Sequence, residues 1–228
     1  MSQQQALKLS VLTEKHYGNW VRYAQVEEAS ARLALWLVKG GGVWLSSEDV
    51  AGKSHLIHAV FKEHPQVKII SPNAANMSSV RQLKSWLSVC EHHAYWVLDL
   101  PAGKLPTPLA YAVFHLIERA KNMNKALLIS WRCTELDMPP ELSSRLLMMP
   151  QVKIEPSNND EDLQRVLESV LQTMQWDMKE TVLPTLLQHV PRNLPDLLNA
   201  IDKLDVYSRE KRVKMNGVLA LKVLGIHD

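Results

Sequence analysis

The sequence predicts an α/β fold with a five-stranded parallel sheet, followed by a small helical C-terminal region. Apolar runs of strand length alternate with amphipathic helical patterns over most of the chain, which is typical of a parallel sheet with helices on both faces. The first apolar run leads through a Gly-Lys-Ser turn into a helix, and after Pro156 only helical patterns remain. We therefore expect a tail over 1–24, an α/β core over 25–156 and a helical lid over 157–228.

The first helix is indicated by apolar residues at helical spacing, and the glycines that follow it allow the chain to turn into the first strand. Its apolar stripe is expected to hold Val26, Ala29, Leu33 and Leu37. The expected strands span 43–45, 67–70, 95–100, 126–130 and 152–154. The further core helices are expected after Ser54 and over 76–90, 107–122 and 141–147.

Two of these helices show a clear apolar stripe, with apolar residues at helical spacing along one face. In the helix over 76–90 the stripe is expected to hold Val80, Leu83, Leu87 and Cys90. In the helix over 107–122 it is expected to hold Leu109, Val113, Leu116, Ile117 and Ala120. Capping residues after Pro156 begin a series of helices, which we expect over 160–174, 180–190, 194–210 and 213–224. This all-helical region is large enough only for a small lid.

The segment Ala51-Gly52-Lys53-Ser54-His55 lies between the first strand and a helix, which is the context that a phosphate-binding loop requires. Backbone N–H groups at a helix start converge on an anion, and the helix dipole favours negative charge there. Lys53 would add a charge for the β- and γ-phosphates, and the Ser54 hydroxyl would bind Mg²⁺. The alternative is a helix N-terminus that carries a solvated lysine.

Two positions of this loop depart from the pattern GxxxxGK[ST]. Ser47 stands where the pattern has its first glycine, and Val50 stands where many such loops have another. A serine follows a glycine path only where its φ angle lies in an allowed region. We therefore expect a loop that is tighter than usual or differently shaped.

Asp99 ends an apolar strand, at the distance from Lys53 where phosphate-binding-loop enzymes hold the water shell of Mg²⁺. A strand-end aspartate can also cap the next turn. The following residue is Leu100, which cannot accept a proton from an attacking water. Ser130 ends the fourth strand, where a polar side chain can sense the γ-phosphate, although strand-terminal serines are common.

Arg145 lies on the short helix that follows the fourth strand. An arginine at this place can act in trans, as an arginine finger on the nucleotide of a neighbouring subunit; the alternative is a surface arginine. The consecutive residues over 90–93 cannot converge on one ion, so we expect no metal site beyond Mg²⁺ at Ser54 and Asp99.

The N-terminal tail carries Gln4, Leu7 and Leu9 in the order Q-x-x-L-x-L. Tails of this kind resemble peptides that dock in the groove of the bacterial DNA sliding clamp, although such a short pattern arises easily by chance. The formal net charge of +2 gives no argument for nucleic-acid binding. Two cysteines, the absence of a signal-peptide pattern and the absence of a long apolar run favour a cytoplasmic protein without a membrane segment.

Taken together, these motifs resemble the DnaA-related AAA+ family, and within it the Hda-type regulators that promote inactivation of the replication initiator. The resemblance covers nearly the whole chain. It lies in the Gln/Leu tail, His16-Tyr17-Gly18-Asn19-Trp20-Val21, Ala51 to Leu56, Leu98-Asp99, Leu127 to Ser130, Leu142 to Leu146 and Leu197 to Asp205.

By this resemblance the fold is an AAA+ P-loop core with a helical lid, and Tyr17 and Val21 lie on the adenine side of the nucleotide. The cofactor would be ADP or ATP with Mg²⁺, bound in a degenerate site, or the site would hold no nucleotide. The implied partners are the replication initiator, the sliding clamp and further copies of the chain. The sequence stops where the initiator adds a helix-turn-helix domain, so we expect no direct DNA binding.

Two other functions stay open at this point. One is an active AAA+ ATPase that remodels or loads another complex, and the other is a nucleotide-free AAA+ scaffold outside replication. Leu100 and Pro195 argue against the ATPase, because the family's second acid and its lid arginine would stand at these positions. We expect no intrinsic ATPase activity of the chain, but stimulation of hydrolysis by a partner.

Overall fold

The computed structural model describes residues 21–72, 78–134, 138–157, 159–174, 176 and 178–226. The chain forms two compact units. Of the described residues, those over 24–155 form one unit, and those over 21–23 and 156–226 form the other. Each unit has a hydrophobic core of its own.

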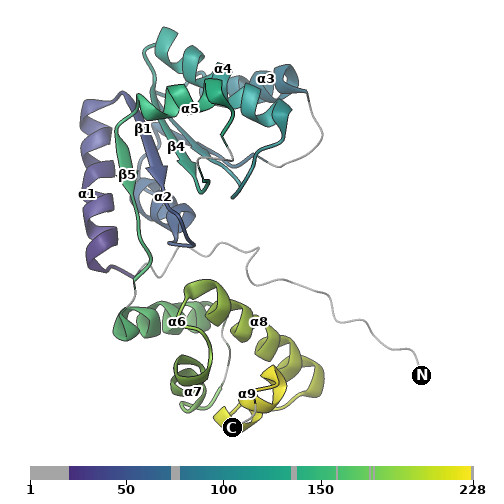
Figure 1. The fold of residues 1–228 in the computed structure, drawn as a ribbon. Helices are drawn as coiled ribbons and strands as arrows, with labels where there is room; N and C mark the ends of the chain where they lie inside the picture. The colour runs from purple at the N-terminus through teal and green to yellow at the C-terminus, as the bar shows by residue number, and fades with distance from the viewer. Residues whose placement is uncertain are drawn as a thin grey trace. The chain divides into compact units, whose positions relative to one another are not determined.

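The Ala24–Glu155 unit alternates helices and strands along the chain (Figure 1). Its strands are β1 (Gly42–Ser46), β2 (Val67–Ile70), β3 (Tyr95–Asp99), β4 (Ala126–Trp131) and β5 (Gln151–Lys153). Its helices are α1 (Ala24–Lys39), α2 (Lys53–Phe61), α3 (Ser79–Cys90), α4 (Thr107–Asn122) and α5 (Pro140–Leu147).

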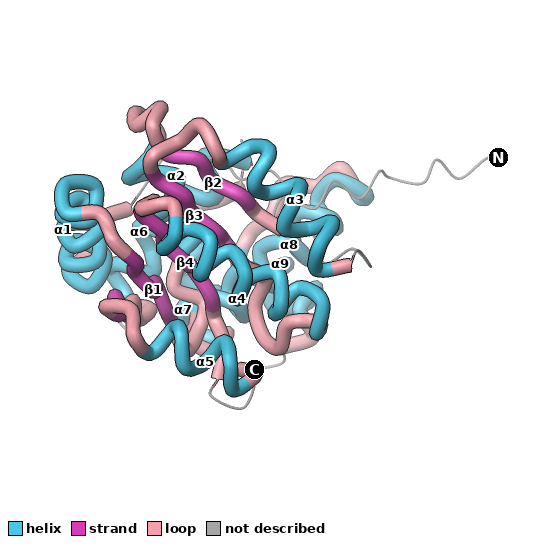
Figure 2. The backbone as a smooth tube through the Cα atoms, turned by 90° about the horizontal axis from the view of Figure 1, so that it is seen from above, coloured by secondary structure: helices cyan, strands magenta, loops and turns pink. Residues whose placement is uncertain are grey.

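The five strands form one sheet in the order β2-β3-β4-β1-β5, and every neighbouring pair is parallel. Figure 2 shows the first four of these strands side by side in this order. In this order the carboxyl ends of β1, β3 and β4 lie side by side. The pairing places Asp99 opposite Ser130, and Ser46 opposite Trp131. The predicted parallel sheet is confirmed, and its carboxyl edge brings together residues that are far apart in the sequence.

The core of this unit follows the two-residue period of the strands. Trp44, Trp96 and Ile129 pack in one cluster with side chains of α3, α4 and α5. The helix pairs α3–α4, α4–α5 and α1–α2 are in contact. All five residues that were expected on the stripe of α4 are buried, and so are the first three of the stripe of α1, whereas Leu37 is half-buried.

The predicted stripe of α3 is wrong at one position. Val80 is 74% exposed, and the buried residues of this helix are Gln82, Trp86 and Cys90. Leu83 and Leu87 pack against the same cluster while only partly buried. The large indole of Trp86 removes more apolar area from water than a valine does, so the helix faces the sheet with the side that carries Trp86.

The C-terminal unit is helical, with α6 (Asp160–Met174), α7 (Val182–His189), α8 (Leu194–Lys211) and α9 (Gly217–Leu224). Leu167, Leu186 and Leu204 are fully buried in its core. Asn193 and Asn216 cap α8 and α9, each accepting a hydrogen bond from a backbone N–H of the first turn. Among the described residues, no helix combines the length and the apolarity that crossing a membrane requires.

Candidate functional site

The loop between β1 and α2 has the geometry of a tight turn into a helix. Gly52 lies immediately before the first residue of α2 and has φ +74° and ψ +22°, a left-handed conformation that glycine adopts without steric cost. Its carbonyl accepts the first helical bond, from Leu56 N at 2.9 Å. Among the described residues, only Asn124 and Arg212 have positive φ without being glycine. Ser47 and Val50 therefore fit this loop without left-handed backbone.

Lys53 bonds to the start of its own loop. Its Nζ donates to Ser47 Oγ at 2.5 Å, across the six positions that separate the two residues. The Ser47 residue is only 3% exposed, and Lys53 is partly buried. The serine in place of the expected glycine thus gives the loop lysine a partner of its own.

The surroundings of Lys53 disfavour its charge. Burial and the neighbouring Arg132 guanidinium lower the pKa of Lys53 from 10.5 to about 8, against the opposing effects of Asp99 and Cys133. Removing a cation from water and placing a second cation beside it both favour the neutral amine. An anionic ligand beside Lys53 would offset both the burial of the ammonium and its repulsion by Arg132, and would so favour the charged form.

Asp99 and Ser130 meet at the carboxyl edge, as the parallel pairing requires. Ser130 Oγ donates to Asp99 Oδ1 at 3.0 Å, and Ser130 is 0% exposed while Asp99 is 7% exposed. The serine therefore orients the carboxylate. Leu100, next along the chain, is buried, and its N–H donates to the carbonyl of Ser130.

The remaining predicted loop residues lie around the start of α2. Ala51 is buried, Ser54 is half-buried and His55 is exposed. The structure therefore brings Lys53, Ser54, Asp99 and Ser130 to one edge of one sheet. Lys53 and Ser54 begin the helix that follows β1, Asp99 ends β3, and Ser130 lies next to the end of β4. This set can hold a polyanion and the cation that accompanies it.

Arg145 lies at the other end of the sheet. It lines a cavity of about 470 Å³ together with Gly42 and Leu127, which are at or near the amino ends of β1 and β4. Its Nε lies 2.7 Å from Glu118 Oε1, and its guanidinium lies over the Phe114 ring at 5.6 Å from the centroid. Arg145 is therefore far along the strands from Lys53, and its described contacts are with side chains of α4.

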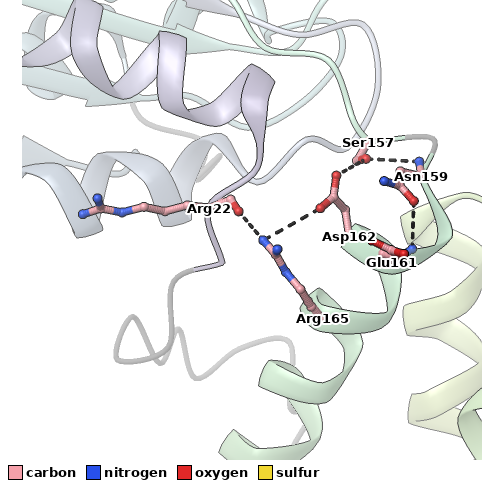
Figure 3. Close-up of polar contacts among 6 residues, drawn as sticks. All are labelled: Arg22, Ser157, Asn159, Glu161, Asp162 and Arg165. Carbon is pink, nitrogen blue, oxygen red and sulfur yellow. Dashed lines mark hydrogen bonds and ion pairs between the residues drawn. The ribbon is translucent and has the colours of Figure 1, made fainter.

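The described residues before α1 belong to the helical unit (Figure 3). Arg165 donates to the carbonyl of Arg22 and lies 3.8 Å from Asp162. Burial and the Asp162 carboxylate raise the pKa of Tyr23. Val21, which was expected on the adenine side, is half-buried and directly precedes this contact.

The other residues predicted for the adenine side and for the tail cannot be placed. Tyr17, Gln4, Leu7 and Leu9 lie outside the described residues. Sequence reasoning noted Arg132 only as a departure from the related family's usual aspartate, and it predicted neither Arg132 nor Cys133 as a neighbour of Lys53. Both directly follow β4, and the only signal that could have found them is that position at the carboxyl edge.

The sequence matches no model of a known protein family and no curated protein. The structure is similar to domain III of the replication initiation protein DnaA from Thermotoga maritima, at 16% identity and a TM-score of 0.68, over 92% of this chain and 95% of that one. It is also similar to the RuvB Holliday junction branch migration motor of the same organism, at 12% identity and a TM-score of 0.61, over 90% of this chain and 70% of that one.

A third similar structure is that of a DNA replication initiation factor, at 15% identity and a TM-score of 0.58, over 87% of this chain and 68% of that one. These similarities confirm the predicted fold class, an α/β fold with a five-stranded parallel sheet and surrounding helices, which the chain shares with these DnaA and RuvB structures. At such identities they concern the fold alone.

Proposed function

We propose that the chain is a DnaA-like AAA+ regulatory protein that binds an adenine nucleotide and acts through protein contacts in the control of replication initiation. The observation that carries the proposal is the carboxyl edge of the sheet, where Lys53 follows a left-handed Gly52 and lies near enough to Asp99 for the carboxylate to favour its charge. A partly buried lysine with a lowered pKa needs an anionic partner, and a phosphate group supplies one.

Mg²⁺ fits the oxygen groups of this edge. The Ser54 hydroxyl and the Asp99 carboxylate are ligands of the kind that Mg²⁺ takes, directly or through water, beside phosphate oxygens. Ser130 holds Asp99 by a hydrogen bond and so acts as a positioning residue. ADP or ATP with Mg²⁺ is therefore the ligand class that we assign, with Ala51, Gly52 and His55 contributing the loop and the helix start.

The chain itself is proposed to hydrolyse little or no ATP. Leu100 is buried and apolar at the place of a second acid, so no carboxylate there activates a water. Arg145 is proposed to act in trans on the nucleotide of the initiator, because it lies at the opposite end of the sheet from Lys53. An active ATPase is the second candidate, and turnover by the isolated chain would favour it.

The partners that we propose are the replication initiator and the DNA sliding clamp, the latter through Gln4, Leu7 and Leu9. Assembly with further copies of the chain is part of the same proposal, because an arginine finger acts across a subunit boundary. Cys90 and Cys133, both among the described residues, form no disulfide, which agrees with a cytoplasmic location. The proposal includes no direct contact with DNA.

The deciding experiment measures the thermal midpoint with ADP or ATP and Mg²⁺ at millimolar concentration. A ligand that binds only the folded chain at 100 times its Kd adds about 2.7 kcal/mol of stability. We expect this gain for the unmodified chain and its loss in Lys53→Ala. If neither nucleotide moves the midpoint of the unmodified chain, the nucleotide part of the proposal fails and the scaffold function is left.

A further inference from the structure

Lys53 is hydrogen-bonded to Ser47, the residue that stands where the loop pattern has its first glycine. Ser47 begins the loop and Lys53 follows it, so the 2.5 Å bond between their side chains joins the two ends of the loop. No atom fits between Oγ and Nζ at this distance. Ser47 Oγ thus occupies one of the three N–H donors of the ammonium, and a phosphate oxygen that uses this donor has to displace the hydroxyl.

We propose that Ser47 sets the nucleotide affinity of this site, because its hydroxyl competes with phosphate for the ammonium of Lys53. The inference rests on the proposed nucleotide function and deepens it. A bond from an ammonium to an oxygen acceptor is charge-assisted and stronger than one between neutral groups. Ser47 is nearly inaccessible to water, so its hydroxyl has few other partners to accept from.

Replacing Ser47 Oγ by a phosphate oxygen at the Lys53 ammonium is favourable, although breaking the existing hydrogen bond costs free energy. Ser47 offers a neutral oxygen, whereas a diphosphate offers several charged ones, so the ligand is the stronger acceptor. Ser47 therefore weakens nucleotide binding, but does not prevent it.

A matched control is available one residue earlier. Ser46 is buried to nearly the same extent as Ser47, at 6% exposed. Its Oγ accepts from Gln151 Nε2 at 2.8 Å and so has a partner on β5. Ser46→Ala removes the same atom from the same segment without touching the Lys53 contact. Because Ser47 has no positive φ, Ser47→Ala needs no change of backbone.

The experiment measures the Kd of ADP with Mg²⁺ by isothermal titration for the unmodified chain, Ser47→Ala and Ser46→Ala. A hydrogen bond to a charged group is worth enough for a roughly tenfold change in Kd. We expect Ser47→Ala to bind ADP roughly tenfold more tightly, and Ser46→Ala to match the unmodified chain. Unchanged or weaker binding in Ser47→Ala overturns the proposal, since the hydroxyl would then be neutral or would position Lys53 for the phosphate.

A second measurement needs no nucleotide. The acetylation rate of Lys53 by acetic anhydride, followed by peptide mass spectrometry at several pH values, reports the pKa of its amine. Loss of a bond that the charged form donates lowers this pKa, so Lys53 should react faster at about pH 7 in Ser47→Ala than in Ser46→Ala. An equal rate overturns the Ser47–Lys53 contact.

The two measurements separate the failure of this inference from that of the proposed function. If ADP binds to none of the three proteins, the nucleotide function is rejected. A faster acetylation in Ser47→Ala then still supports the contact, but the idea of competition with phosphate falls together with the nucleotide function.

Discussion

Lys53→Met should make the folded chain more stable at neutral pH in the absence of nucleotide. The lysine is partly buried, and its pKa of about 8 in the folded chain compares with 10.5 for a free lysine. Burial is the largest cause and the Arg132 guanidinium the second, while Asp99 and Cys133 act in the opposite direction. Methionine has a similar length and carries no charge, so it removes the unfavourable burial of the ammonium.

The size of the effect follows from the two pKa values. Each pH unit between them corresponds to about 1.36 kcal/mol, so the buried charge costs the folded state about 3 kcal/mol at pH 7. Methionine also leaves the Ser47 hydroxyl without its donor, which costs about 1 kcal/mol. We therefore expect the unfolding free energy of Lys53→Met to exceed that of the unmodified chain by about 2 kcal/mol at pH 7.

The pH dependence has a definite sign. Below the folded pKa of about 8 the lysine is charged in both states and the folded state carries the whole penalty. As the pH rises from about 8 to 10.5 the folded chain releases its proton first, so the unfolded state binds more protons and the stability of the unmodified chain increases. The advantage of Lys53→Met should therefore shrink across this interval and be lost at its upper end.

The assay is urea unfolding at about pH 7, 9 and 10, followed by tryptophan fluorescence. Five of the seven tryptophans lie in the Ala24–Glu155 unit, so the signal reports mainly the unit that contains Lys53. The reasoning is refuted if Lys53→Met is less stable than the unmodified chain at the lowest of these pH values. It is equally refuted if the difference between the two proteins is the same at all three pH values.

Two substitutions and one deletion test the other assigned roles. Asp99→Asn should remove the Mg²⁺-dependent part of nucleotide affinity while leaving binding in EDTA unchanged, and an equal loss in both titrations would contradict a role toward the ion. Arg145→Ala should leave nucleotide binding intact and lower the stimulation of initiator hydrolysis by roughly 10³-fold or more, whereas Glu118→Ala should retain it. Deletion of 1–9 should abolish clamp binding without moving the thermal midpoint, and equal clamp affinity with and without the tail would remove the tail from the proposal.

The elements around the loop could be predicted because their signals are local. A strand-length apolar run, a glycine at a left-handed position and a helical stripe specify β1, Gly52 and α2 without knowledge of the rest. The placement of Asp99 and Ser130 at the carboxyl edge also follows from sequence, since Asp99 ends β3 and Ser130 lies next to the end of β4. The sequence could not tell that Ser130 donates to Asp99, because that depends on which strands are neighbours.

The side chains that the sequence misplaced or missed depend on contacts between elements. Val80 shares the helical spacing of its stripe, but the burial of Trp86 decides which side of α3 faces the sheet. Trp36 lies outside the predicted stripe of α1, yet it is buried, and its ring makes a tilted contact with Phe61 and an edge-to-face contact with Tyr95. Such contacts between helices and strands leave no periodic signal in a single sequence.

Lys53 and Arg145 are both held by groups of their own chain, but by contacts of different strength. The Arg145–Glu118 pair is more than one third exposed on both sides, and an exposed ion pair of this kind contributes about 0–1 kcal/mol. Releasing Arg145 toward the phosphates of a neighbour therefore costs little. The Ser47–Lys53 contact is shielded from water, so its exchange for phosphate costs more. Under the proposed function, the chain's own nucleotide affinity is thus more strongly restrained than its proposed action on a partner's nucleotide.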